Sequence, residues 1–133
     1  MLRITLLILL VISACSSFAT TKTTSVEGEQ AEIKAVVQAA RDYIESQHKS
    51  DKDQMARALH PKLAKRTFWQ AQDGSEFVME TSRKTMLNVA QNYNRNGDKF
   101  PESPRIDIEV LAIDQRIASV KLSADDWVDY MHL

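Results

Sequence analysis

The chain has 133 residues, with 17 basic and 18 acidic side chains and a formal net charge of −1. This length allows one folded domain of ordinary size. A near-neutral chain lacks the excess of Lys and Arg that neutralises phosphates, so we expect no nucleic-acid partner. Only three glycines occur, and neither G-x-G-x-x-G nor the P-loop motif is present, which argues against the usual nucleotide-binding folds. The single cysteine excludes an internal disulfide.

The first 14 residues follow the plan of a signal peptide. Arg3 precedes a run, Ile4 to Ile12, that is apolar apart from Thr5, and small residues follow it. The run is about half of the ~20 apolar residues that span a bilayer, so we expect export rather than a permanent membrane helix. Two cleavage sites compete. The sequence ending in Cys15 resembles the lipobox of bacterial lipoproteins and predicts a lipid on Cys15, whereas small residues before Thr20 suit ordinary cleavage after Ala19.

Residues 15–28 are rich in Ser and Thr and almost free of apolar side chains, which is typical of a flexible tether. The predicted organisation is therefore a signal peptide over 1–14 (alternatively 1–19), a tether over 15–28 and one domain over 29–133. By resemblance to Gram-negative lipoproteins, Ser16 after the cysteine favours the outer membrane. We expect a protein of the periplasm or outer membrane in a Gram-negative cell, and a secreted protein otherwise.

Three helices are predicted in the domain. Helical spacing from Ile33 to Ile44 indicates an amphipathic helix over 29–48. A second helix is expected to start near Ser50 and to break at Pro61, because proline has no N–H donor and disfavours helical geometry in the residue before it. A third is expected over 82–94, with Met86, Leu87, Ala90 and Tyr93 on one face.

Five strands are predicted around these helices. Residues 67–69 and 77–79 flank Asp73-Gly74, a dipeptide suited to a tight hairpin turn. Apolar and polar residues then alternate over 106–110 and 118–122, with a short turn at 114–116, and a last strand covers 127–133. This order of helices and consecutive strands indicates the α+β class.

The chain resembles the nuclear transport factor 2-like superfamily and, within it, the putative lumazine-binding family. The motifs that carry the resemblance are Ala58-Leu59-His60-Pro61 ahead of Ala64-Lys65-Arg66, then Ile113-Asp114, Ala118 to Lys121, and the Asp-Tyr-x-x-Leu within 127–133. The resemblance implies a cone-shaped barrel, in which about three N-terminal helices pack on a strongly curved antiparallel sheet around an interior cavity. It also implies a homodimer through the sheet.

One departure from the family concerns the end of the chain. Relatives continue past the Asp-Tyr motif with a further strand, so the resemblance predicts that a C-terminal strand is missing here. Residues 129–133 are then expected to form a sheet edge.

Candidate catalytic residues follow from the same resemblance to SnoaL-like and ketosteroid-isomerase-like relatives. Asp129 is a candidate general base, with Tyr130, His132 or His60 as hydrogen-bond donors. Strand alternation places Asp129 and Trp127 on one face and Tyr130 and His132 on the other, and it leaves open which face lines a cavity. A structural role is the favoured interpretation for Asp129, and a capping or packing role for His60.

Aromatic side chains suited to a small-molecule pocket are Tyr43, Trp69, Tyr93 and Trp127. No paired-histidine spacing occurs, so we expect no metal, and no cofactor is indicated. The favoured function is an exported, lipid-anchored domain that binds a small, partly aromatic ligand without transforming it. The alternatives are an isomerase or dehydratase that uses Asp129, and an interaction domain that dimerises through its sheet.

Overall fold

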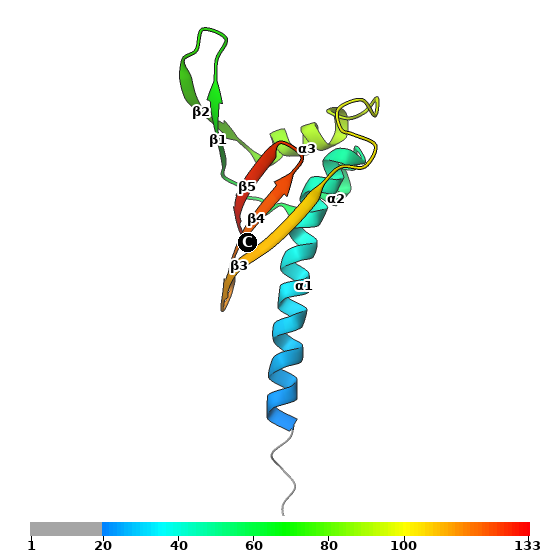
Figure 1. Cartoon of the computed structure of the whole chain (residues 1–133), viewed down its shortest axis with the longest axis vertical. Helices are drawn as coiled ribbons and strands as arrows, with labels where there is room; N and C mark the ends of the chain where they lie inside the picture. Colours follow the sequence, from blue (N-terminus) through cyan, green and yellow to red (C-terminus); the bar gives the residue numbers. More distant parts are fainter. Residues whose placement is uncertain (1–19) are drawn as a thin grey trace, which may run out of the picture.

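The structure is a computed structural model that describes residues 20–133, with side chains from residue 26 onward. The predicted signal peptide and both cleavage sites, at Cys15 and after Ala19, lie outside the described residues. Three helices and five strands follow one another in the expected order (Figure 1). They are α1 (Thr20–His48), α2 (Lys52–Ala58), β1 (Lys65–Gln70), β2 (Glu76–Thr81), α3 (Arg83–Asn92), β3 (Ile106–Asp114), β4 (Ile117–Ala124) and β5 (Trp127–His132).

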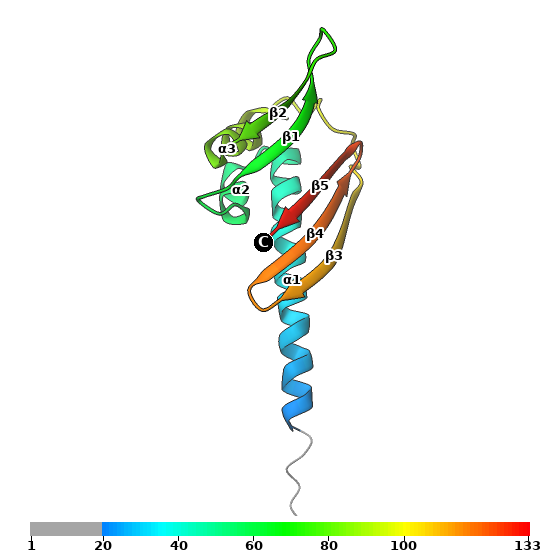
Figure 2. The same ribbon diagram turned by 90° about the vertical axis from the view of Figure 1, so that its left-hand side faces the viewer.

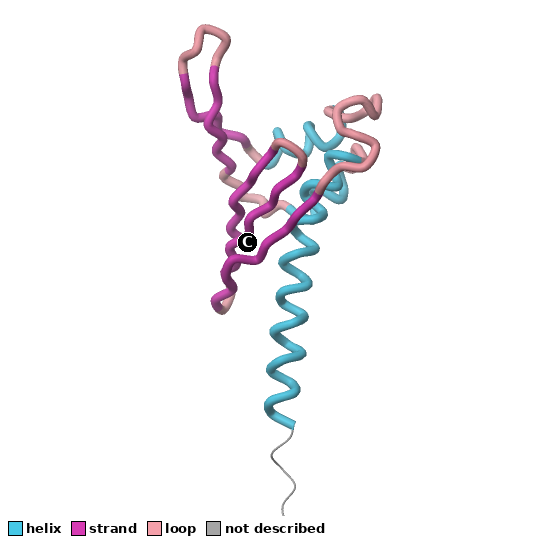
Figure 3. Tube along the Cα trace, viewed as in Figure 1, coloured by secondary structure: helices cyan, strands magenta, loops and turns pink. Residues whose placement is uncertain are grey.

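Helix α1 begins at Thr20, nine residues before the predicted start at Glu29. Residues 20–28, which the sequence assigns to the tether, are therefore helical in the structure. They contain no proline, and extending a helix that has already formed costs little per residue. This part of α1 extends beyond the strands (Figure 3), and the side chains from Val26 to Gln30 are exposed.

The other two helices are capped by side chains. Asp51 caps α2, because its carboxylate accepts a hydrogen bond of 2.9 Å from the backbone N–H of Gln54. The cap is thus one residue after Ser50, where the sequence predicts the helix to start, and α2 ends at Ala58, ahead of Pro61 as expected. Ser82 caps α3 by accepting a hydrogen bond of 3.2 Å from the N–H of Thr85.

The strands form two separate antiparallel sheets. Strands β1 and β2 pair as the predicted hairpin, with Gly74 in its turn at a φ of +82°. Strands β3, β4 and β5 form a three-stranded sheet in that order. The α+β class is confirmed, but the described strands do not close into a barrel, because β5 pairs only with β4 and no described strand joins it to the hairpin. Strand β5 is therefore a sheet edge, as predicted for residues 129–133.

The core lies between the C-terminal half of α1, the two short helices and the inner face of β4. Its buried members are Tyr43, Ile44, Met55, Leu59, Met86, Ala90, Leu122 and Ala124. Burying a Leu or Met side chain stabilises the fold by about 1.5–3 kcal/mol, so this cluster sets the position of the sheet against the helices. The tip of the β1–β2 hairpin points away from the helices and from the three-stranded sheet (Figures 1 and 2). Phe68, Phe77 and Val78 of the hairpin are exposed.

Candidate functional site

Strand β5 turns Asp129 and Met131 toward the helices. Met131 packs against the core cluster, and Asp129 is half-buried beside it. On the opposite face, Val128, Tyr130 and His132 are exposed, and Tyr130 retains 70% of its accessible surface. The face with Trp127 and Asp129 therefore points toward the helices, and we call it the inner face.

A polar cluster joins three elements on this inner face. The Nζ atom of Lys65, the first residue of β1, lies 2.5 Å from Oδ1 of Asp129. The Tyr43 hydroxyl, from α1, donates a hydrogen bond of 3.1 Å to Oδ2 of Asp129 and accepts one of 3.0 Å from Lys65. With Trp127, described next, we call these residues the inner-face cluster: Tyr43, Lys65, Trp127 and Asp129.

Two aromatic rings surround the lysine ammonium. Lys65 Nζ lies 5.4 Å from the centre of the Tyr43 ring and 5.3 Å from that of the Trp127 ring. Both distances are within the range at which a cation is attracted to an aromatic face. The Lys65 and Asp129 side chains are each only 16% exposed, so solvent screens their ion pair less than it screens a surface pair.

Burial raises the pKa of the Tyr43 phenol well above its ordinary value, and the negative charge of Asp129 adds to the shift. Tyr43 is therefore a neutral hydroxyl at physiological pH. It can donate to Asp129 and accept from Lys65 at the same time, as the distances show. The result is a preorganised set of one cation, one anion and one hydroxyl, and its cation faces an indole that is 38% exposed.

The model of the Putative lumazine-binding family matches residues 31–133, which is nearly the whole predicted domain. The chain belongs to this family. Comparison with curated proteins and with solved structures found no match. Membership in the family agrees with a small-molecule-binding domain.

Within this family member, the four candidate catalytic residues do not come together. Asp129 is on the inner face of β5, whereas Tyr130 and His132 are on the outer face, where His132 Nδ1 lies 3.2 Å from the Ser119 hydroxyl. His60 is exposed in the loop after α2, and its Nδ1 accepts a hydrogen bond of 3.1 Å from the N–H of Lys62.

The candidate pocket aromatics are also divided. Tyr43 and Trp127 belong to the inner-face cluster. Trp69 is 46% exposed on the protruding hairpin, and Tyr93 follows α3, where its ring packs edge-on against Phe100 with centroids 5.8 Å apart. Only two of the four aromatic side chains are therefore placed to contact one ligand.

Sequence reasoning missed Lys65. Its tripeptide contributes to the family resemblance, but the exposed apolar residues of β1 obscure the alternation that would have revealed its inward direction. No apolar-polar alternation marks Lys65 as inward-facing, because Lys65, Arg66 and Thr67 are all polar, and its half-burial is known only from the structure.

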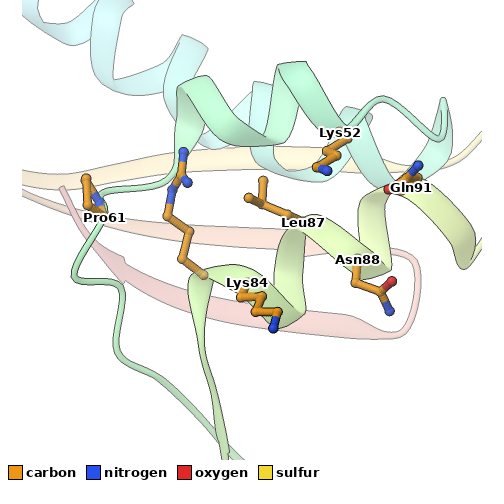
Figure 4. A pocket seen from close by; sticks show the side chains of 7 residues that line it. Lys52, Pro61, Lys84, Leu87, Asn88 and Gln91 are labelled. Carbon is orange, nitrogen blue, oxygen red and sulfur yellow. The ribbon is translucent and has the colours of Figure 1, made fainter.

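Two surface cavities occur elsewhere in the described part of the chain. One, of about 450 Å³, lies between α2 and α3 (Figure 4), and the other, of about 230 Å³, lies between α1 and the β3–β4 turn. Neither is lined by a residue of the inner-face cluster. Among residues 20–133, no three His, Cys, Asp or Glu side chains are grouped to hold a metal, and no helix is long and apolar enough to cross a membrane.

Proposed function

We propose that this protein is an exported domain that binds a small, planar, partly aromatic ligand at the inner-face cluster without transforming it. The observation that carries the proposal is the half-buried Lys65–Asp129–Tyr43 arrangement beside a partly exposed indole, in a chain of the Putative lumazine-binding family. Ligand sites in proteins combine apolar and aromatic walls with a few fixed polar groups, and this cluster supplies both.

The chemistry of the cluster suits a heteroaromatic ring such as lumazine. The ring face can stack on the Trp127 indole, whose exposed part is accessible from solvent. Ring carbonyls can accept a hydrogen bond from the Lys65 ammonium, and ring N–H groups can donate to Asp129. Because Tyr43 already holds both charged groups in place, little side-chain entropy is lost when the ligand binds.

Binding without turnover is favoured by the surroundings of Asp129. Asp129 is held in place by hydrogen bonds from Lys65 and from Tyr43, each to one carboxylate oxygen. Of the donors that an isomerase would use, Tyr130 and His132 are on the opposite face of the strand, and His60 is exposed in the loop after α2. A general base must reach the proton that it removes, and its partner must reach the same substrate.

The proposal is tested by calorimetric titration of the protein with lumazine. We expect the Lys65→Met and Asp129→Asn variants each to weaken binding about tenfold or more, because charge-assisted hydrogen bonds are lost. The control is Arg66→Met. Arg66 is the next residue of β1 and pairs with Glu80 at 3.2 Å, but both side chains are largely exposed. Absence of lumazine binding to the unaltered protein, or an equal loss in the control, contradicts the proposal.

Export and lipid anchoring are part of the same proposal and are supported by the sequence of residues 1–14 and by the position of Cys15. A bacterial host that expresses the full chain is expected to incorporate labelled fatty acid into it and to retain it in the membrane fraction. The Cys15→Ser variant loses both the label and the retention. An unlabelled protein that is cleaved after Ala19 supports the secreted alternative.

The free edge of β5 supports a homodimer as the assembly. Among the described residues β5 pairs on one side only, and unpaired strand edges recruit other strands. Sedimentation over a range of concentrations tests this expectation, and a protein that stays monomeric at the highest concentration contradicts it.

A further inference from the structure

The cleft between α2 and α3 lies apart from the inner-face cluster and shares no residue with it. Its volume of about 450 Å³ is within the 300–1,000 Å³ that small-molecule sites occupy. Figure 4 shows side chains from both helices and from the loop after α2 around it. This cleft is not part of the ligand site proposed at the inner-face cluster.

Three cationic side chains line the cleft. Lys52 comes from α2, and Arg83 and Lys84 come from α3. No Asp or Glu is among the lining residues, although acidic residues outnumber basic ones in the whole chain. Three like charges around one cleft repel one another, and the lining itself supplies no counter-charge. A bound anion would supply it.

Arg83 is held in a fixed position at the wall of the cleft. Its Nε donates a hydrogen bond of 3.1 Å to the carbonyl oxygen of Leu59, and its Nη2 donates one of 2.9 Å to that of Ala56. Both carbonyls belong to the end of α2, so Arg83 ties the two helices together. Its positive charge is therefore fixed at the wall of the cleft, which Lys52 and Lys84, both exposed, also line.

The remaining lining residues indicate what kind of organic group carries the anionic group of the ligand. Pro61 and the half-buried Leu87 provide an apolar surface, and Asn88 and Gln91 provide amide groups at the end away from Pro61 (Figure 4). Such a surface fits a ligand with a small organic group rather than a free inorganic ion. Burying the organic group against Pro61 and Leu87 adds apolar contact to the charge attraction.

We propose that the α2–α3 cleft binds a small phosphate monoester, with its phosphate at Lys52 and Lys84 and its organic part over Leu87 and Pro61. A phosphate monoester carries a charge of about −1.5 to −2 at pH 7, which matches three cations better than a carboxylate does. The Arg83 side chain contributes to the attraction through its charge, while its hydrogen bonds remain with α2.

The site is tested with phenyl phosphate as the probe and backbone-amide NMR of the full chain as the readout. We expect chemical-shift changes concentrated in α2 and α3, an affinity that falls as salt is added, and no such changes with phenol. The Lys52→Gln/Lys84→Gln double variant is expected to bind about tenfold or more weakly while its spectrum stays dispersed. The matched control, Lys34→Gln/Lys99→Gln, removes two exposed lysines outside the cleft and is expected to bind normally.

A second arm distinguishes a soluble phosphate ester from a lipid headgroup. Vesicles of phosphatidylcholine with phosphatidic acid are compared with vesicles of phosphatidylcholine alone, using the same variants. Phosphatidic-acid-dependent binding that the double variant loses assigns the site to a lipid headgroup, and binding of phenyl phosphate without it assigns the site to a soluble ester. The proposal is overturned if neither probe binds, or if the double variant and the control bind equally well.

Discussion

Lys65 and Asp129 are 64 positions apart in the sequence and form an ion pair of 2.5 Å that connects β1 to β5. These strands belong to different sheets, so this contact links the protruding hairpin to the main sheet without any backbone pairing between them. The Tyr43 hydroxyl completes the connection by reaching both charged groups from α1. These three side chains therefore contribute both to the stability of the fold and to the proposed binding site.

Removing the carboxylate leaves the lysine ammonium largely buried without its counter-charge. We expect Asp129→Asn to lower the free energy of unfolding by roughly 1–3 kcal/mol, measured by urea denaturation. The exposed pair Arg66–Glu80 on the same hairpin is the control, and Glu80→Gln is expected to change the stability by less than about 0.5 kcal/mol. Equal losses in the two variants would show that the inner pair is no stronger than a surface pair.

The raised pKa of Tyr43 predicts a loss of stability at alkaline pH. Burial, assisted by the charge of Asp129, keeps the phenol protonated in the folded protein above its ordinary pKa of 10.0, whereas the unfolded chain releases the proton there. The folded state then binds more protons, so the free energy of unfolding falls as pH rises through about 10. In Tyr43→Phe this part of the fall is absent.

Phenolate absorbance reports the same group directly. Subtracting the titration of Tyr43→Phe from that of the unaltered protein isolates Tyr43, and we expect the difference to develop only as the protein unfolds. A difference that develops near pH 10 in the folded protein contradicts the buried hydrogen-bonded hydroxyl.

Local patterns account for most of the fold but not for the inner-face cluster. The capping residue Ser82, the turn at Gly74 and the alternation along β4 each act within a few residues, so they can be recognised in the sequence. The contact between Lys65 and Asp129 depends on how two sheets sit against α1, and no local rule encodes that arrangement. The sequence likewise does not predict that the hairpin is separate from the main sheet, because strand pairing between distant segments is a tertiary property.

The lowered pKa of His48 predicts a loss of stability at mildly acidic pH. Its ring packs on Phe100 with centroids 4.3 Å apart, and its Nε2 is buried without a hydrogen-bond partner among the described residues. Burial lowers the pKa of His48 below its ordinary 6.5, although Asp125 and Glu45 oppose the shift. The unfolded chain then binds the proton more readily, so the free energy of unfolding decreases as pH falls below about 6.5.

Urea denaturation between pH 5 and 8 checks this dependence with matched variants. His48→Phe keeps an aromatic ring against Phe100 and is expected to flatten the pH profile in this range. His60→Phe changes an exposed histidine and is expected to keep the slope. A profile that stays steep in His48→Phe assigns the effect to other groups.

We expect a charge reversal at Lys84 to have opposite effects on the stability of the fold and on anion binding. It lies in the first turn of α3, where there is no acidic residue, and negative side chains near a helix N-terminus stabilise helices by about 0.3–1 kcal/mol. We expect Lys84→Glu to raise the melting temperature slightly and to abolish phenyl phosphate binding. A variant that is destabilised, with binding retained, contradicts both expectations.

Tryptophan fluorescence reports ligand binding at the inner-face cluster itself. The chain has two tryptophans, Trp127 in the cluster and Trp69 on the exposed hairpin, so each single-tryptophan variant reports one place. We expect lumazine to quench Trp69→Phe, in which Trp127 remains, with a saturable dependence on concentration that Lys65→Met weakens. In Trp127→Phe we expect only the weak, unsaturated quenching of an exposed indole. Saturable quenching of Trp69 alone, or of neither residue, would contradict ligand binding at the inner-face cluster.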